Sequence, residues 1–224
     1  DRALFETVLA STVHDMKNSL SLLLGQLDVI SEKLARDMEN QQAVSTLRYE
    51  ASRINYSLME LLTLYRLEKK QIGMNISEVV VLDFIEDCVA DHSIIAANKG
   101  IRLETECDEE LIWFFDLDLV GIAINNILGN TIRYSRELVR ISVTTHDGML
   151  LIQIDDDGSG YPQKLLDAVD DFSSEINAQT GSTGLGLYFA ATIADSHQRH
   201  ARLGHIRLQN AVALSGGSFQ LFLP

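Results

Sequence analysis

The first residues of the chain that could perform chemistry are His14 and Asp15, followed by Asn18. A neutral imidazole is a competent nucleophile near pH 7, and a neighbouring carboxylate can accept its second N–H and fix its tautomer. On a helix, His14 and Asn18 lie four residues apart and therefore on one face. Taken alone, the segment is more simply interpreted as a solvated surface histidine beside a solvated aspartate.

A second set of polar residues lies on the segment that follows Asp116. Asn126 and Asn130 are four residues apart, so on a helix both amides face the same way. An amide oxygen is a suitable ligand for a hard cation such as Mg²⁺. Arg133 and Tyr134 place a guanidinium and a phenol near the C-terminal end of this helix. Paired asparagines are also common as surface residues, so this set is weak evidence alone.

Two glycine-rich segments could hold a nucleotide. Asp156 follows an apolar strand, and its carboxylate can accept a hydrogen bond from the amino group of adenine. Gly158 and Gly160 let the backbone turn tightly against a ligand, although an ordinary β-turn would explain the same residues. Residues 181–187 open a helix with glycines, which exposes N–H groups that can bind phosphate. This segment is neither a Walker A loop nor a dinucleotide fingerprint.

The segment that carries His14 has the periodicity of helices that pack along a seam. Up to about residue 68 the chain contains no proline and one glycine, and apolar residues repeat at alternating spacings of three and four. The first seam comprises Leu9, Val13, Met16, Leu20, Leu23, Leu27, Ile30 and Leu34, and the second comprises Val44, Leu47, Ala51, Ile54, Leu58, Leu61 and Tyr65. His14 falls on an outward heptad position, so we expect its imidazole to face solvent.

A short polar connection at residues 35–40 suits two antiparallel helices. Further apolar residues beside the seams widen the apolar face beyond what one hairpin can cover; they are Leu22, Leu24, Leu62 and Leu64. We therefore expect a homodimer whose two hairpins form a four-helix bundle. The alternative is that the hairpin packs against the second domain of its own chain.

After residue 70 the pattern changes to strands mixed with helices. Strands are expected at residues 75–81, 101–107, 111–115, 139–145, 149–155, 205–209 and 218–223, and helices at 82–98, 116–133 and 184–196. This mixture predicts a two-layer α/β sandwich with a mixed sheet. The expected fold class is thus α + α/β, with domains at residues 1–70 and 71–224.

Composition limits the partners. A net charge of -14 argues against nucleic acid and anionic membrane surfaces, because both reward positive charge. Cys88 and Cys107 lack metal-ligand spacing and are too few for a disulfide framework, as expected of reduced thiols in a cytosolic protein. No stretch is long and apolar enough to cross a bilayer, and no signal peptide is evident. The sequence starts inside a helical pattern, so any membrane attachment is expected in a preceding sensor portion.

Taken together and in this order, the segments resemble the two-domain cytoplasmic core of bacterial two-component sensor histidine kinases. Residues 14–18 resemble the H box of that family, residues 126–130 its N box, residues 156–160 its G1 box and residues 184–187 its G2 box. Asp171 and Phe172 stand where the F box is expected, and residues 217–224 resemble the usual closing strand. The resemblance covers nearly the whole chain.

The resemblance implies ATP-dependent autophosphorylation of His14, with Asp15 orienting the imidazole, and phosphoryl transfer to an aspartate of a response regulator receiver domain. Asn18 falls where the family places a residue that orients water for dephosphorylation of the regulator. Residues 1–70 would be the dimerisation and histidine phosphotransfer hairpin, and residues 71–224 the ATP-binding catalytic domain. The expected location is the cytoplasm, either free or as the cytoplasmic portion of an inner-membrane protein.

The resemblance also assigns the binding residues. Asp156 would recognise adenine, Asn130 would hold Mg²⁺ with support from Asn126, and Arg133 and Tyr134 would contact phosphates. The expected nucleotide contacts are completed by Gly158, Gly160, Gly184, Leu185 and Gly186.

The chain departs from the family pattern at three places. Ser19 replaces a common proline, and residues 198–199 replace a frequent glycine pair. Residues 173–183, the expected lid of the ATP site, contain no Lys or Arg, where relatives often place a cation. This last departure supports an alternative, a regulatory phosphatase or scaffold with weak autokinase activity. A chaperone-like or topoisomerase-like ATPase would share the nucleotide fold but would lack the heptad hairpin.

Overall fold

The computed structural model describes residues 16, 18–27, 29–30, 38–68, 73–168 and 183–224. The chain divides into two compact units, Asp1–Ile72 and Gly73–Pro224. The predictions for His14, Asp15, Asp171 and Phe172, and for lid residues 173–182, lie outside the described residues.

The described residues of the first unit are helical. Residues 18–27 lie in a helix, and α2 spans Met38–Glu68. Leu27, Val44 and Ala51 are buried together, and Leu20 and Leu24 pack against them. Apolar residues from both helices thus form the core of the hairpin. If heptads are counted from Val13 in the first seam and from Val44 in the second, four of these five residues occupy the first position.

The fourth position of the same heptads stays uncovered. These side chains are large, apolar and exposed: Met16, Leu23, Ile30, Leu47, Ile54 and Leu61. Among the described residues of the seam, the first positions are thus buried or half-buried, and the fourth positions are open to water. Contiguous apolar surface of this kind is typical of a face that packs against a partner.

The second unit contains a five-stranded mixed sheet with the strand order β2-β4-β5-β9-β8. Its strands are β2 (Arg102–Glu106), β4 (Leu138–His146), β5 (Met149–Asp156), β8 (His205–Asn210) and β9 (Gly217–Leu223). The β2–β4 pair is parallel and the other pairs are antiparallel. A separate two-stranded sheet pairs β1 (Ile76–Val80) with β3 (Ile112–Asp116).

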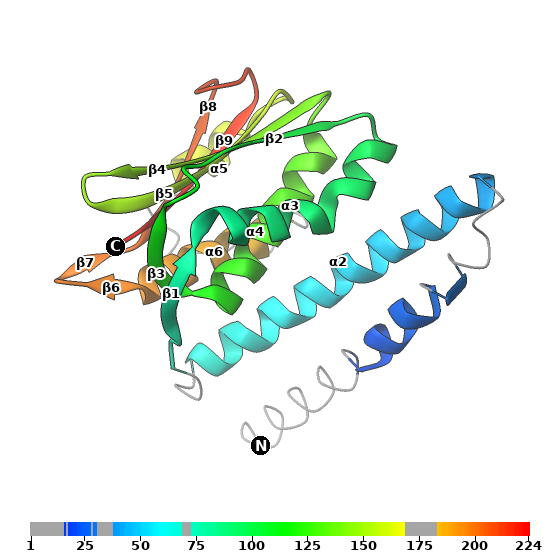
Figure 1. The fold of residues 1–224 in the computed structure, drawn as a ribbon, viewed down its shortest axis with the longest axis horizontal. Helices are drawn as coiled ribbons and strands as arrows, with labels where there is room; N and C mark the ends of the chain where they lie inside the picture. The colour runs from blue at the N-terminus through cyan, green and yellow to red at the C-terminus, as the bar shows by residue number, and fades with distance from the viewer. Residues whose placement is uncertain (1–15, 17, 28, 31–37, 69–72, 169–182) are drawn as a thin grey trace. The chain divides into compact units, whose positions relative to one another are not determined.

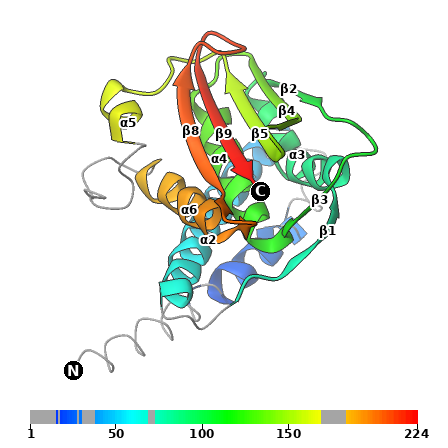
Figure 2. The same ribbon diagram turned by 90° about the vertical axis from the view of Figure 1, so that its left-hand side faces the viewer.

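Three long helices cover one face of the five-stranded sheet (Figures 1 and 2). They are α3 (Val81–Asn98), α4 (Leu117–Tyr134) and α6 (Thr183–Ser196). Alternate strand residues face these helices, so Ile141, Ile154 and Phe219 lie in register across three strands and are almost fully buried. The predicted α/β sandwich with a mixed sheet is confirmed.

The predicted strands and long helices of the second unit are all present, with ends that differ from the predicted ones by at most one residue. Among the described residues, the sequence did not predict three short elements: α5 (Gln163–Ala168) and the hairpin of β6 (Gln198–Arg199) and β7 (Arg202–Leu203). They are too short to show a periodicity of their own. Within the part of the chain that the structure describes, no helix is both long enough and apolar enough to cross a membrane.

Candidate nucleotide-binding site

Helix α4 carries the two asparagines of the N box. It starts after Asp116, whose Oδ1 accepts a hydrogen bond from the backbone N–H of Leu119 (3.0 Å) and so caps the helix. One turn separates Asn126 from Asn130, and Nδ2 of Asn130 donates to Oδ1 of Asn126 (2.8 Å). This bond fixes the amide of Asn130 by its nitrogen, which turns its oxygen away from Asn126.

The G2 box lies directly against these asparagines. At Gly186, near the start of α6, an added Cβ would overlap Oδ1 of Asn126. Only glycine therefore lets α6 approach α4 this closely at the N box. Leu187 is buried and Leu185 is half-buried, so both anchor the start of the helix in the core. Gly184, the remaining G2 residue, lies in the first turn of α6.

The G1 box holds a buried carboxylate at the end of β5. Asp156 is 7% exposed, and its Oδ1 accepts a hydrogen bond from the N–H of Gly158 (2.7 Å). Burial raises the pKa of this carboxyl above its ordinary value, and hydrogen bonds from the backbone of Gly158 and Gly217 oppose the shift. An added Cβ at Gly216 would overlap Oδ1 of Asp156, and one at Gly217 would lie 2.9 Å from Oδ2.

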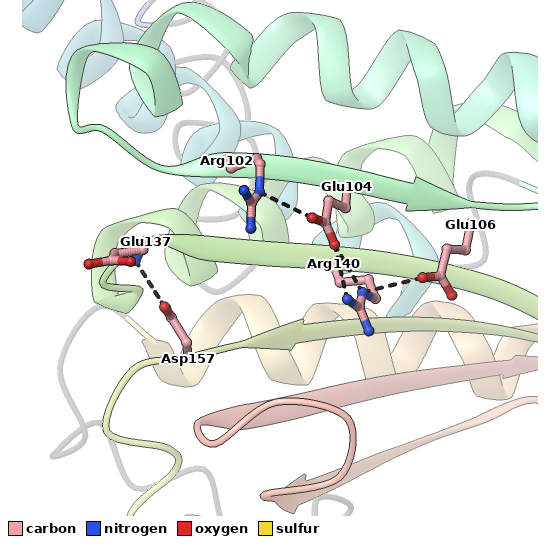
Figure 3. A network of polar contacts seen from close by, with 6 residues as sticks. All are labelled: Arg102, Glu104, Glu106, Glu137, Arg140 and Asp157. Carbon is pink, nitrogen blue, oxygen red and sulfur yellow. Dashed lines mark hydrogen bonds and ion pairs between the residues drawn. The ribbon is translucent and has the colours of Figure 1, made fainter.

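The neighbouring carboxylate, Asp157, ties the G1 box to the end of α4. It accepts hydrogen bonds from the backbone N–H groups of Arg136 (2.8 Å) and Glu137 (3.0 Å), as Figure 3 shows for Glu137. Burial raises the pKa of Asp157, but hydrogen bonds from the backbone of Arg136, Glu137, Leu138 and Asp157 itself together lower it more, so the pKa lies below its ordinary value. An added Cβ at Gly158 would overlap the backbone oxygen of Tyr134, which places the G1 box in direct contact with the end of α4, the helix that carries the N box.

Ion pairs stabilise the sheet beside this contact. In Figure 3, Glu104 of β2 lies between Arg102 and Arg140, and Arg140 of β4 also reaches Glu106. Arg140 and Glu104 are register partners, and two nitrogens of the guanidinium donate to one carboxylate oxygen (3.2 and 3.0 Å). They clamp the parallel strand pair on the face opposite the helices.

Arg133 and Tyr134 both project from the end of α4 and are exposed. The guanidinium of Arg133 lies 5.8 Å from the centre of the Tyr134 ring, within the range of a cation–π contact. Of the ten residues predicted to bind nucleotide, contacts join Asn126 to Asn130 and Gly186, and Gly158 to Asp156 and Tyr134. The other four lie in the same segments of the second unit; they are Arg133, Gly160, Gly184 and Leu185. Asn18, predicted to act beside His14, is exposed on the first unit.

The sequence alone did not reveal two parts of this region. One is the contact of Gly216 and Gly217 with Asp156, for which the glycine pair before the closing strand was the available signal. The other is His197, which is 3% exposed. Its Nε2 accepts a hydrogen bond from the N–H of Asp116 (3.0 Å), and its Nδ1 lies 2.7 Å from the carbonyl oxygen of Ile193. His197 therefore links the end of α6 to the start of α4.

Comparison with known proteins agrees with this geometry. Residues 115–224 match the family described as histidine kinase-, DNA gyrase B-, and HSP90-like ATPases. The sensor histidine kinase GraS of Staphylococcus haemolyticus is 30% identical over 225 residues, which cover 98% of this chain and 61% of GraS. The catalytic domain of histidine kinase ThkA shares 21% identity and a TM-score of 0.57, over 67% of this chain and 96% of that domain.

A third similarity extends over both units. The structure of full-length ShkA in complex with AMPPNP covers 97% of this chain and 45% of its own, with 20% identity and a TM-score of 0.65. The fold and the site define a nucleotide-binding domain of the histidine kinase type joined to a helical unit. Residues 115–224 belong to the histidine kinase-, DNA gyrase B-, and HSP90-like ATPases, and the chain as a whole is similar to two-component sensor histidine kinases. It spans about 60% of the length of its relative GraS.

Proposed function

We propose that this chain binds ATP with Mg²⁺, transfers the γ-phosphoryl group to His14, and passes it to an aspartate of a response regulator. The observation that carries this proposal is the buried carboxylate of Asp156, enclosed by glycines and joined through Tyr134 to the asparagine pair of α4. A buried, sterically restricted carboxylate suits recognition of a base, and amide oxygens suit a phosphate-bound cation.

The site fits ATP at both ends. Asp156 would accept a hydrogen bond from the amino group of adenine, while Gly158 and Gly160 bring the backbone close to the base. At the other end, the N–H groups at the start of α6, from Gly184 to Gly186, would bind phosphate oxygens, since that end of a helix carries positive potential. Arg133 and Tyr134 are exposed at the end of α4 and would contact the phosphates.

The donor set also fits Mg²⁺. Because Nδ2 of Asn130 is bonded to Asn126, the Oδ1 of Asn130 is the atom presented to a ligand. An Mg²⁺ ion held there would neutralise charge on the phosphates, and Asn126 would keep the ligating amide in place.

The first unit would supply the phosphate acceptor. His14 would attack the γ-phosphorus, with Asp15 orienting the imidazole and assisting removal of its proton. Asn18, one turn further along the helix, would orient water when the regulator is dephosphorylated. The exposed half of the heptad seam supports a homodimer, in which two hairpins form a four-helix bundle. Two free cysteines and the use of ATP favour the cytoplasm as the compartment.

A regulatory phosphatase or scaffold with weak autokinase activity is the second candidate. The observation in its favour is the sequence of residues 173–183, which contains no Lys or Arg. Transfer of a phosphoryl group develops negative charge that enzymes commonly offset with cations.

The test is incubation of the homodimer with γ-labelled ATP and Mg²⁺, followed by a panel of receiver domains. Acid-labile phosphate on the chain supports a kinase, whereas ATP binding without it supports the second candidate. Release of free phosphate without a phosphoprotein would indicate an ATPase and contradict both. His14→Gln should abolish labelling without changing ATP affinity, and His146→Gln, at an exposed histidine of β4, is the matched control. Labelled His14→Gln protein would refute His14 as the acceptor.

A further inference from the structure

Asn210, the last residue of β8, lies outside every motif segment, yet both ends of its side-chain amide form hydrogen bonds with the backbone of one residue, Tyr161. The backbone N–H of Tyr161 donates to Oδ1 of Asn210 (2.7 Å), and Nδ2 of Asn210 donates to the backbone oxygen of Tyr161 (3.0 Å). The amide thus makes the same pair of hydrogen bonds that an adjacent strand would make. It fixes the backbone of the chain where it leaves the G1 box.

Gly160 lies flat against this amide. Its φ is +75°, and an added Cβ would lie 2.7 Å from Oδ1 and 2.8 Å from Cγ of Asn210. Any other residue would be strained in this left-handed conformation and would push the amide of Asn210 away. The second glycine of the G1 box and Asn210 are therefore matched to each other.

The backbone of Asn210 leads to the other side of Asp156. Asn210 is the register partner of Gly217, whose N–H bonds to the Asp156 carboxylate. Gly216, just before it, donates its N–H to the backbone oxygen of Asp156 (2.9 Å). The ring of Tyr161 packs on Gly217, where an added Cβ would lie 2.9 Å from Cε2. Asn210 consequently joins the two segments that flank Asp156.

We propose that Asn210 is a positioning residue of the adenine pocket: it holds the exit of the G1 box and the start of β9 so that the Asp156 carboxylate faces the base. It acts through Tyr161 and Gly160, since both polar ends of its amide are used by Tyr161. This inference rests on the proposed role of Asp156 as the acceptor for adenine.

The test compares ATP with inosine triphosphate, which carries an oxygen where adenine carries its amino group. Calorimetric titrations are made on the whole chain as wild type, Asn210→Ala and the control Gln209→Ala, at the adjacent exposed residue of β8. We expect Asn210→Ala to weaken ATP binding by about tenfold, the effect of one to two lost hydrogen bonds. The affinity for inosine triphosphate should fall less, so that the preference for ATP becomes smaller. Gln209→Ala should leave both affinities unchanged.

Unchanged ATP affinity in Asn210→Ala would overturn the proposal. An equal loss for both nucleotides would also overturn it, because that result describes general destabilisation and not positioning of Asp156. If the wild type itself fails to bind ATP, or does not prefer it to inosine triphosphate, the proposed function fails instead.

A double-mutant cycle with Gly160 gives a second, independent readout. Gly160→Ala should weaken ATP binding in the wild-type background, because the new methyl group displaces the Asn210 amide. In the Asn210→Ala background the amide is absent, so the loss of ATP affinity caused by Gly160→Ala should be several-fold smaller. The part that remains would come from backbone strain at residue 160. Strictly additive losses would show that the two residues do not act together, contrary to the proposal.

Discussion

The two units of the chain differ in how they bury their apolar side chains. The hairpin buries the first heptad positions, such as Leu27 and Val44, and exposes the fourth, such as Leu23 and Leu47. The second unit instead closes its core, where Phe115, Phe189 and Phe219 are fully buried. The exposed fourth positions of the hairpin fit the homodimer proposed above, whereas the described part of the nucleotide-binding unit encloses an apolar core of its own.

Charge and glycine content divide in the same way. Residues 1–72 carry 10 of the 32 acidic and 9 of the 18 basic residues, a net charge of -1, and the remainder gives residues 73–224 a net charge of -13. Only one of the 14 glycines, Gly25, lies in the hairpin. A nearly neutral helical seam suits association between copies. The glycine-rich unit would bind the polyanion ATP against its own negative charge, so in the proposed function Mg²⁺ and each local cation would matter more.

The largest effect is expected where the hairpin is incomplete. Leu23→Asp places a charge on the open half of the seam, twice per dimer, and removes about 3–6 kcal/mol of apolar burial. The dimer dissociation constant should rise by roughly 10²- to 10⁴-fold in sedimentation equilibrium. Ser21→Asp, on an exposed outward position of the same helix, should leave it unchanged. An undisturbed Leu23→Asp dimer would show that association uses another face.

The charge contrast yields the next prediction. If the lid lacks one charge-assisted contact to the γ-phosphate, the barrier is higher by roughly 2–3 kcal/mol, which is about 30- to 150-fold in rate. Asn177→Arg or Gln179→Arg should accelerate single-turnover labelling of His14 by up to that factor. Gln179→Met, similar in length and uncharged, is the control. A wild type that is already fast, with no gain from either arginine, would make the missing cation irrelevant.

Replacing the central carboxylate tests the second unit alone. Asp156→Asn should weaken ATP binding by about 10- to 150-fold, the range for a hydrogen bond to a charged group, without altering the dimer. Asp157→Asn is the matched control, because Asp157 bonds the backbone of Arg136 and Glu137. Calorimetry at fixed Mg²⁺ measures both. Equal affinities for wild type and Asp156→Asn would remove Asp156 from the adenine site.

The sequence predicted features that depend on residues close together in the chain, but not contacts between residues that are far apart in the chain. The heptad pattern predicted the helices, and alternation predicted the strands such as β4 and β5, because both are local periodicities. The pattern could not predict which half of the seam packs inside one hairpin, since Leu20 and Leu23 are equally apolar. Nor could it pair Asn210 with Tyr161, 49 residues apart, because strand register decides that contact.

The smallest expected effect concerns His197, which lies in the second unit together with most of the histidines of the chain. Five of the six histidines lie in the second unit, and two of them, His92 and His197, are buried. Nε2 of His197 accepts the N–H of Asp116, so Nδ1 must carry the proton that reaches the oxygen of Ile193. The protonated ring cannot accept, and burial lowers the pKa of His197 despite the opposing effects of Ile193 and Asp116.

A lowered pKa means that the native state favours the neutral ring. The resulting stability is fully present above the unfolded pKa, about 6.5, and is lost as the pH falls toward the lowered native value. Leaving the buried N–H of Asp116 without an acceptor costs about 1–3 kcal/mol.

Trp113, the single tryptophan, lies on β3 three residues from Asp116, so its fluorescence reports unfolding of the second unit. When the pH is lowered from 7.5 to 5, we expect the melting temperature of the second unit to fall. The fall should be smaller in His197→Gln, and protonation of His92 should account for part of the fall that this variant still shows. His146→Gln should keep the full shift, and an identical shift in His197→Gln would show that His197 does not couple protonation to this fold.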